Sequence, residues 1–255
     1  MPHMPDPFAK KLIVDLGNTR AKLAVFIGDK IHDVQFFDPN SSQDNNPEFV
    51  LKPFLTSGPF SACIISSVST PTAPLRALLA DVPVVEFTPD TPVPIQNHYH
   101  SPSTLGADRL AAAVAAHGLY PDNDVLVIDA GTAITYEFIN KEGAYQGGGI
   151  TAGVSMRLKS LNTFTSRLPL VEAQFPGFLI GRNSEESILS GVMNGIRAEM
   201  DGIIQEYKQL YPGLITLFTG GDMFYFEKKL KNDIFATPNL VLTGLNLILE
   251  YNLEK

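Results

Sequence analysis

The sequence predicts an α/β fold built from two related halves, and three observations support this prediction. One pattern occurs twice, at Leu12–Phe26 and Val125–Phe138: an apolar run, an Asp, a Gly two residues later, a Thr and further β-forming residues. This pattern is typical of a strand, a tight turn and a second strand. Strand-like segments alternate with helical ones along the chain, which indicates the α/β class. The 255 residues, 44% of them hydrophobic, fit one large or two medium domains.

The two halves are expected to meet at the turn Pro121–Asp124. A flexible lead-in over residues 1–10 would precede a first half at 11–121, and the second half would occupy 122–255. Because each half begins with the same pattern, the two turns are expected to face each other.

The remaining elements follow from apolar patterning and from turn residues. Short apolar runs predict strands at Ala62–Val68, Val82–Phe87 and Leu214–Phe218. Helices are predicted for a segment ending at Ala80, for Leu110–Leu119, Val154–Thr163 and Leu240–Leu253, and for a long segment after Asn183. Four prolines make Thr88–Ser103 irregular.

The long helix after Asn183 has a regular apolar pattern. Asn183 can cap this helix, and the acids Glu185 and Glu186 suit its first turn. Apolar residues three or four apart predict one buried stripe along it. They are Ile188, Val192, Ile196, Met200, Ile203, Tyr207 and Leu210.

Composition and charge disfavour several classes of function. The net charge of −8 disfavours a nucleic-acid-binding surface, which needs clustered Lys and Arg. No apolar run in the sequence reaches the roughly 20 residues that span a bilayer. The single cysteine, Cys63, lies in a strand-like run and is expected to be a buried structural thiol. We therefore expect a cytoplasmic protein without nucleic-acid or membrane partners.

An acid follows the first apolar run of each repeated pattern. The carboxylate of Asp15 or Asp129 can hold Mg²⁺, while N–H groups and the Thr hydroxyl of the turn can bind phosphate oxygens. Alternatively, each Asp only stabilises a tight turn. A buried strand rarely ends in an acid that has no partner for its charge. Because the pattern also occurs twice, it favours phosphate and metal binding.

Gly106–Arg109 is a second candidate motif. Phosphoryl transfer to an alcohol needs a carboxylate to accept the hydroxyl proton and a cation for the developing charge. Asp108 and Arg109 supply both if they face the same site. The alternative is an ordinary helix N-terminus, where the dipole favours acids. A third segment, Thr219–Asp222, has a Gly pair that either admits a base or ribose or forms a plain turn.

Other polar residues are expected to be solvated. His98 and His100 lie in the Pro-rich segment, and no third ligand is spaced with them for a metal site. Arg157 and Lys159 are also expected to be solvated. Lys22 is the best candidate of the three cations to reach a phosphate.

Three motifs in this order resemble those of the type III pantothenate kinases: DLGNTRAK at 15–22, GADR at 106–109 and DAGT at 129–132. That family belongs to the superfamily of acetate kinase, sugar kinases, heat-shock chaperones and actin. The resemblance covers nearly the whole chain and extends through GGITAGV at 148–154, GRNSEESILSG at 181–191 and TGGD at 219–222. It implies two actin-like, ribonuclease H-like halves, each a mixed β-sheet flanked by helices, with a nucleotide cleft between them.

The resemblance implies a kinase. Such an enzyme transfers the γ-phosphoryl group of ATP to pantothenate and gives 4′-phosphopantothenate, the first step of coenzyme A biosynthesis. It also implies Mg²⁺, a monovalent cation (K⁺ or NH₄⁺) and a homodimer. Two alternatives stay open: another small-molecule kinase of the superfamily, and a non-catalytic regulatory homologue. The acids and Arg109 argue against the regulator, because a scaffold has no use for a base, a phosphate-binding cation and a metal-binding acid together.

The resemblance also implies roles for individual residues. Asp108 would be the general base with Arg109 beside it, Asp129 would hold the monovalent cation, and Asp15 would lie near Mg²⁺. ATP-binding residues would be Asp15, Leu16, Gly17, Asn18, Thr19, Arg20, Ala21, Lys22 and Thr132. Pantothenate-binding residues would be Tyr99, Gly106, Ala107, Asp108, Arg109 and Ser184. Two positions depart from the family, since Ser184 replaces a usual Thr and Ala152 a frequent Pro; neither removes a group needed for the chemistry.

Overall fold

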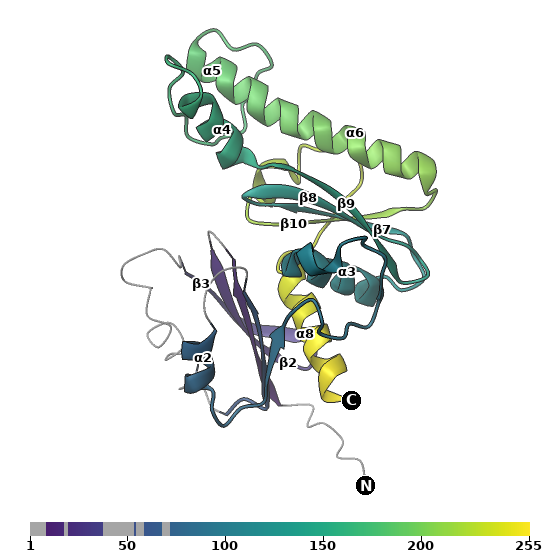
Figure 1. Ribbon diagram of the computed structural model, residues 1–255. Helices are drawn as coiled ribbons and strands as arrows, with labels where there is room; N and C mark the ends of the chain where they lie inside the picture. The colour runs from purple at the N-terminus through teal and green to yellow at the C-terminus, as the bar shows by residue number, and fades with distance from the viewer. Residues whose placement is uncertain (1–8, 18–19, 38–53, 55–58, 68–71) are drawn as a thin grey trace. The chain divides into compact units, whose positions relative to one another are not determined.

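The computed structural model describes residues 9–17, 20–37, 54, 59–67 and 72–255, and Figure 1 shows its elements. The chain forms two compact units. Unit 1 contains the residues up to Gly118 together with Leu240–Lys255, and unit 2 contains Leu119–Asn239. No helix in the described part of the chain is long and apolar enough to span a membrane.

Unit 1 is built on a five-stranded sheet in the order β3-β2-β1-β4-β5. Strands β1 (Lys10–Leu16), β2 (Ala21–Ile27) and β3 (Lys30–Phe37) are antiparallel neighbours. Strands β4 (Ala62–Ser67) and β5 (Val84–Phe87) run parallel to β1. The structure thus confirms the predicted first hairpin and both predicted strands, with β5 starting two residues later than expected.

Both faces of the central strands in unit 1 are buried, which explains why β1 reads as a continuous apolar run. On one face, Val14 packs with Leu75 of α2 (Ala73–Leu78). Helix α8 (Leu240–Leu253) packs against β1 and β4 from the other side (Figure 1). Cys63 in β4 is fully buried, and this burial raises the pKa of its thiol to about 12, as expected of a structural cysteine.

Unit 2 repeats the strand arrangement of unit 1. Within this unit the order is β9-β8-β7-β10-β11. Strands β7 (Val125–Ala130), β8 (Ala133–Ile139) and β9 (Ala144–Ala152) are antiparallel, and β10 (Ile215–Thr219) and β11 (Phe235–Ala236) run parallel to β7. When the strands of each unit are numbered along the chain, both units therefore have the spatial order 3-2-1-4-5. The prediction of two related halves, each a mixed sheet with helices, is confirmed.

Helices cover one face of the sheet in unit 2 (Figure 1). Tyr136 of β8 shares an apolar core with Leu158 of α4 (Val154–Thr163) and Met200 of α6 (Gly195–Leu210). The bounds of α4 agree with the prediction at both ends. Three short elements complete the described chain: β6 (Gln96–Asn97) and a 3₁₀ turn (Pro102–Thr104) in the Pro-rich segment, and α7 (Met223–Phe226) in unit 2.

The C-terminal helix belongs to a different unit from the one that the sequence indicated. The predicted second half ran from 122 to 255, whereas α8 groups with unit 1. The reason is its packing: Gly244 lies so close to α3 (Ala107–Leu119) that a Cβ there would be 1.8 Å from the Ala111 carbonyl oxygen. At its other end, Glu250 forms an ion pair with the buried Lys11 of β1.

The long helix of unit 2 contains an irregular turn that the sequence analysis missed. It consists of α5 (Ser184–Leu189), a π-helical turn (Ser190–Asn194) and α6. The buried residues 188, 192, 196, 200 and 204 are each four apart. On a continuous α-helix this spacing would rotate the apolar stripe by roughly 160°. The extra residue of the π turn removes roughly 100° of that rotation and keeps the stripe on the core.

The predicted stripe is correct except at its end. Leu210, expected to be buried, is 72% exposed because it is the last residue of α6, where the apolar core no longer covers the helix. Ile204, which the sequence analysis did not select, is fully buried instead.

Two glycines give a matched test of the contact between α3 and α8. The Gly244→Ala variant is expected to lose about 1–3 kcal/mol of unfolding free energy, the usual cost of overpacking, despite the higher helix propensity of Ala. Gly202→Ala in α6 is expected to gain up to about 1 kcal/mol, because a Cβ there meets nothing within 4 Å. Urea unfolding of both variants measures this difference, and equal effects would contradict the close contact.

Candidate functional site

The first repeated turn carries a nearly buried acid. Asp15 is the next-to-last residue of β1 and is 8% exposed. In the sheet it lies opposite Lys22 of β2 and Ser66 of β4. The Lys22 ammonium is 3.9 Å from the Asp15 carboxylate, so this lysine is held at the turn.

The other predicted ATP-binding residues of this turn differ in how exposed their side chains are. Leu16 and Ala21 are buried in the sheet, so only their backbones can serve a ligand. A Cβ at Gly17 would lie 2.7 Å from the Arg20 carbonyl oxygen, which shows that the turn is tight. Arg20 itself is exposed, with its guanidinium 5.6 Å from the Phe36 ring centre. Asn18 and Thr19, also predicted to bind ATP, lie outside the described residues.

The carboxyl of Asp15 is electrostatically coupled to a second acid. Burial raises the pKa of Asp15 to about 6. The positive charge of Lys22 lowers this pKa in part, and the negative charge of Asp108 raises it further. The effect of Asp108 places it within electrostatic range of Asp15. The two acids are 93 residues apart in the chain.

Gly106–Arg109 forms the start of α3, three residues earlier than the helix start predicted at Leu110. Asp108 is exposed in the first turn, and its Oδ1 accepts a hydrogen bond of 2.8 Å from the Arg109 N–H. A Cβ on residue 106 would lie 2.6 Å from that oxygen, so Gly106 leaves room for the carboxylate. Ala107, the first helical residue, is half-buried beside them.

Arg109 is held by an aromatic ring. Its side chain is buried, and its guanidinium lies 5.3 Å from the centre of the Tyr99 ring. Nη1 also donates a hydrogen bond of 3.4 Å to the Tyr99 hydroxyl. Stacking on a ring face suits a planar guanidinium and restricts its orientation. Two predicted substrate-binding residues, ten positions apart, thus lie in direct contact.

The second repeated turn has hydroxyl groups around its acid. Asp129, half-buried near the end of β7, lies opposite Thr135 of β8 and Thr219 of β10. Thr132 is exposed at the tip of the turn, and its carbonyl accepts a hydrogen bond of 3.1 Å from the Gly153 N–H. The N–H of Asp222 donates to the Ala130 carbonyl at 2.8 Å. The predicted segment around Thr219–Asp222 therefore lies beside this turn.

The two turns share a geometry and differ in charge. Each acid lies beside a buried hydroxyl residue on the parallel neighbour strand, Ser66 in unit 1 and Thr219 in unit 2. The antiparallel neighbour of Asp15 is Lys22, whereas that of Asp129 is a Thr. Within the described residues, no group of three or more His, Cys, Asp or Glu side chains could hold a metal ion. A cation at either turn would therefore complete its shell with hydroxyls, carbonyls, water or a bound phosphate.

Ser184 lies at the start of α5, on a firmly held backbone. The side chain of Asn183 accepts a hydrogen bond from the Glu186 N–H, which confirms the predicted cap. Glu186 in turn accepts a bond of 2.7 Å from the Arg182 N–H. These bonds fix the exposed Ser184 at the helix N-terminus.

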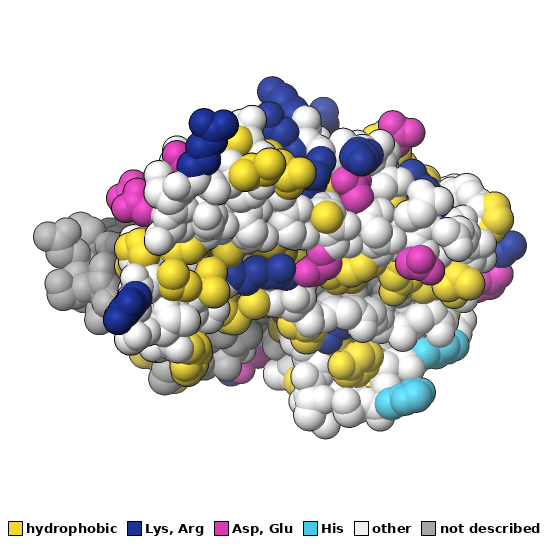
Figure 2. All heavy atoms as spheres, turned by 90° about the horizontal axis from the view of Figure 1, so that it is seen from above, with side chains coloured by type: hydrophobic (Ala, Val, Ile, Leu, Met, Phe, Trp, Pro, Cys, Tyr) yellow, Lys and Arg dark blue, Asp and Glu magenta, His cyan; other side chains and the backbone are white. Residues whose placement is uncertain are grey.

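The loop before α5 is held by the π turn. Ser190 donates to the Leu179 carbonyl, and the Asn194 amide donates to the Phe178 carbonyl at 3.2 Å. Leu179 and Ile180 are nevertheless 74% and 78% exposed. Figure 2 shows the face over α4, α5 and α6, where hydrophobic side chains reach the surface between charged ones. Leu179 and Ile180 thus stay exposed although hydrogen bonds hold the loop backbone beside them.

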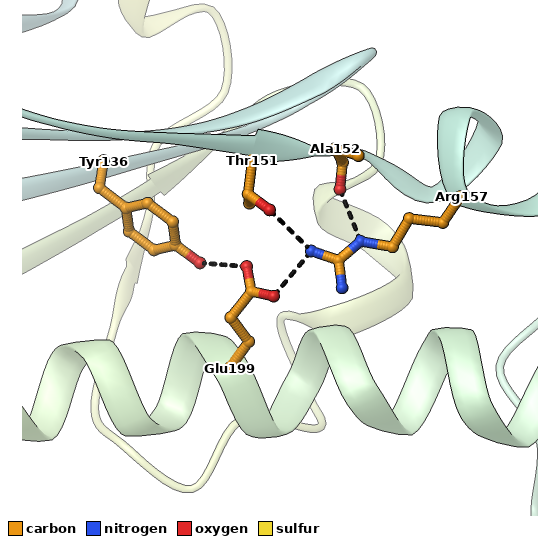
Figure 3. A network of polar contacts seen from close by, with 5 residues as sticks. All are labelled: Tyr136, Thr151, Ala152, Arg157 and Glu199. Carbon is orange, nitrogen blue, oxygen red and sulfur yellow. Dashed lines mark hydrogen bonds and ion pairs between the residues drawn. The ribbon is translucent and has the colours of Figure 1, made fainter. Parts of the chain in front are cut away.

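Two charged side chains form contacts that the sequence did not predict. Arg157, expected to be solvated, is half-buried and forms an ion pair with Glu199 of α6 (Figure 3). The fully buried Glu137 of β8 accepts a hydrogen bond from the Tyr145 hydroxyl. Glu137 lies between Tyr136 and Phe138 in β8, and a charge inside such an apolar run indicates a buried pair. For Arg157 no local pattern was available, because its partner is 42 residues away.

The chain is similar to known proteins over most of its length. The type III pantothenate kinase family model matches residues 11–206. A type III pantothenate kinase from Phocaeicola vulgatus is 47% identical over 94% of this chain and 98% of its own length.

Solved structures support the fold alone. A Campylobacter jejuni protein described as a Baf family transcriptional activator has a TM-score of 0.59 and 20% identity, covering 96% of this chain and all of that one. A Listeria monocytogenes protein described as an N-acetylmannosamine kinase has a TM-score of 0.51 and 14% identity, covering 95% of this chain and 99% of its own.

The raised pKa of Asp15 predicts a pH-dependent loss of stability. The folded state holds this proton up to pH about 6, whereas the unfolded chain loses it near the usual Asp pKa of 3.8. Between these values the folded state binds more protons, so the free energy of unfolding falls as pH rises, by up to about 3 kcal/mol. Asp15→Asn is expected to lack this decrease. Urea unfolding of both proteins without divalent cations, between pH about 4 and 7, measures it; parallel curves would contradict the assignment.

Proposed function

Because this chain belongs to the type III pantothenate kinase family, we propose which of its residues act when it phosphorylates pantothenate with ATP. The enzyme is a phosphotransferase of coenzyme A biosynthesis, as its family match and its relatives show. The proposals concern individual residues, cations and assembly. The observation that supports them most is the contact between Arg109 and Tyr99, because it holds a cation next to the candidate base Asp108.

Asp108 is the proposed general base. It is exposed at the start of α3, so a substrate hydroxyl can reach it, and the Arg109 N–H orients its carboxylate. Phosphoryl transfer is loose and mostly electrostatic, so the base accepts the proton late and mainly aligns the hydroxyl. The nearby negative charge of Asp15 adds to that of Asp108, so bound cations would stabilise this site.

Arg109 and Tyr99 are proposed to bind pantothenate and the transferred group. The guanidinium is stacked and buried, so it can meet an anion without first losing much side-chain freedom. Gly106 and Ala107 line the same segment with little side-chain bulk. Ser184 is the proposed further contact to pantothenate, through the hydroxyl that replaces the family's usual Thr.

The two turns are proposed to bind ATP and its cations. Asp15 with Mg²⁺, and the backbone and cations of residues 16–22, would hold the phosphates in unit 1, while Thr132 would contact ATP in unit 2. Asp129 would hold K⁺ or NH₄⁺, and the hydroxyl residues opposite it fit a cation that prefers oxygen ligands. When bound, these cations neutralise phosphate charge.

A homodimer is proposed as the working form. The exposed apolar residues Leu179 and Ile180 lie on a loop that is held in place, and they support contact with a second copy of the chain. The use of ATP supports the expected cytoplasmic location.

The acceptor and cation are tested together by measuring ADP release from ATP and Mg²⁺, with and without pantothenate, in K⁺ and in Na⁺ buffer. We expect turnover only when both pantothenate and K⁺ are present. If turnover in Na⁺ buffer equals that in K⁺ buffer, the proposed binding of K⁺ by Asp129 is wrong. Pantothenate-independent or absent turnover would favour another kinase of the superfamily or the regulatory homologue.

The role of the base is tested by Asp108→Asn. We expect kcat to fall about 10²–10⁴-fold, the usual effect of losing a general base, with the fold intact. Asp90→Asn, an exposed acid in the same unit, is the control and should retain wild-type activity. A kcat within a few-fold of wild type for Asp108→Asn would show that another group accepts the proton.

A further inference from the structure

A half-buried polar network joins helix α6 to the end of β9 in unit 2 (Figure 3). At its centre is Arg157, in the first turn of α4. Its Nε donates to the Ala152 carbonyl at 2.7 Å, and its Nη2 donates to the Thr151 hydroxyl at 3.1 Å. Nη2 also lies 2.7 Å from the carboxylate of Glu199. One guanidinium thus binds the last two residues of a strand and an acid on another helix.

The backbone that Arg157 holds is in direct contact with the second repeated turn. Gly153 follows Ala152, and its N–H donates to the Thr132 carbonyl at 3.1 Å. A Cβ at position 153 would lie 2.0 Å from the Gly131 carbonyl oxygen. There is therefore no free space between this backbone and the turn, and a shift of residues 151–153 would move Thr132.

Glu199 keeps Arg157 in place. Its second oxygen accepts a hydrogen bond of 3.4 Å from the Tyr136 hydroxyl. Burial, and then the charge of Glu199, raise the pKa of Tyr136, so this hydroxyl stays a donor. Met200, the neighbour of Glu199, is fully buried and anchors this part of α6. The acid is thus attached to the rigid core of unit 2.

The network is not needed to attach α4 to the core. The apolar residues Val154 and Leu158 of this helix are 1% and 3% exposed and already pack there. By contrast, the side chains of Arg157 and Glu199 are 23% and 29% exposed, and such a pair adds modest stability. Its bonds end on the two residues that precede Gly153, which indicates a local role at the turn.

We propose that Arg157 and Glu199 are positioning residues that hold the Gly131–Thr132 turn in the geometry that binds ATP. The proposal rests on the assignment of Thr132 to ATP in the proposed function. Arg157 acts through the backbone of residues 151–153 and touches neither ATP nor the reacting atoms. Glu199 acts through Arg157.

The test compares Arg157→Ala and Glu199→Gln with the wild type. Binding of a non-hydrolysable ATP analogue with Mg²⁺ in K⁺ buffer is measured by calorimetry, and KM and kcat are measured for both substrates. We expect about tenfold weaker nucleotide binding and a similarly raised KM for ATP, as for groups that orient a ligand-binding residue. The KM for pantothenate should stay within about twofold, because the turn acts on ATP alone. Glu199→Gln keeps the shape and should have a smaller effect in the same direction.

Lys159→Ala is the matched control. Lys159 is an exposed cation on the same helix, so its removal changes the charge equally without touching the network. Arg157→Lys keeps the charge but not the planar fork that reaches Ala152 and Glu199 together, so it should resemble Arg157→Ala. If Lys159→Ala weakens nucleotide binding as much as Arg157→Ala, the effect is one of charge and the proposal is wrong.

A double variant separates positioning from general stability. If Arg157 acts through the turn, then Arg157→Ala added to Thr132→Ala should weaken nucleotide binding by less than the product of the single effects. Fully independent effects, or nucleotide binding within about twofold of wild type for both Arg157→Ala and Glu199→Gln, would overturn the proposal. A wild type that binds the analogue but does not phosphorylate pantothenate would instead contradict the proposed function and leave this inference in place.

Discussion

A carboxylate at the end of a buried strand is costly to keep charged unless a cation lies beside it, and both sheets of this protein place an acid there. At Asp15, one lysine at 3.9 Å does not offset the burial, because the pKa is still raised to about 6. At Asp129 the neighbours in the sheet are hydroxyl residues. At Asp15 the described neighbours alone thus leave the charge incompletely stabilised. Phosphate-bound cations can supply what is missing.

Much of the fold could be predicted, because its strands, turns and helices follow from patterns of residues that are close together in the sequence. The duplicated strand–turn–strand pattern predicted two related halves, and the matching order of five strands in each unit agrees with it. The candidate residues in unit 1 were found for the same reason: Asp108 and Arg109 are adjacent, and Tyr99 lies at a spacing that the family resemblance supplied. Short motifs identify such residues, but they do not show that Arg109 stacks on Tyr99 or that Asp108 acts on Asp15.

What could not be predicted depends on contacts between distant segments. Arg157 looks like any helical surface cation until Glu199, Ala152 and Thr151 surround it. The π turn had a signal, because one row of buried positions from Ile188 to Ile204 keeps a spacing of four. The sequence pattern hides it when spacings of three and four are treated alike. The sequence predicted the bounds of α8 correctly. It could not indicate which unit α8 joins, since that depends on how Gly244 fits against α3.

The return of α8 to unit 1 has a consequence for synthesis on the ribosome. Unit 2 is continuous in sequence, so all of its residues have been made when Asn239 is added. Unit 1 is interrupted in sequence by unit 2, and its helix α8, which packs against β1 and β4, is made only after unit 2. Domains usually fold in the order in which they are translated. Here the unit whose synthesis starts first receives its helix α8 only after unit 2 has been made. A chain that stops before Leu240 would contain all residues of unit 2 but only part of unit 1.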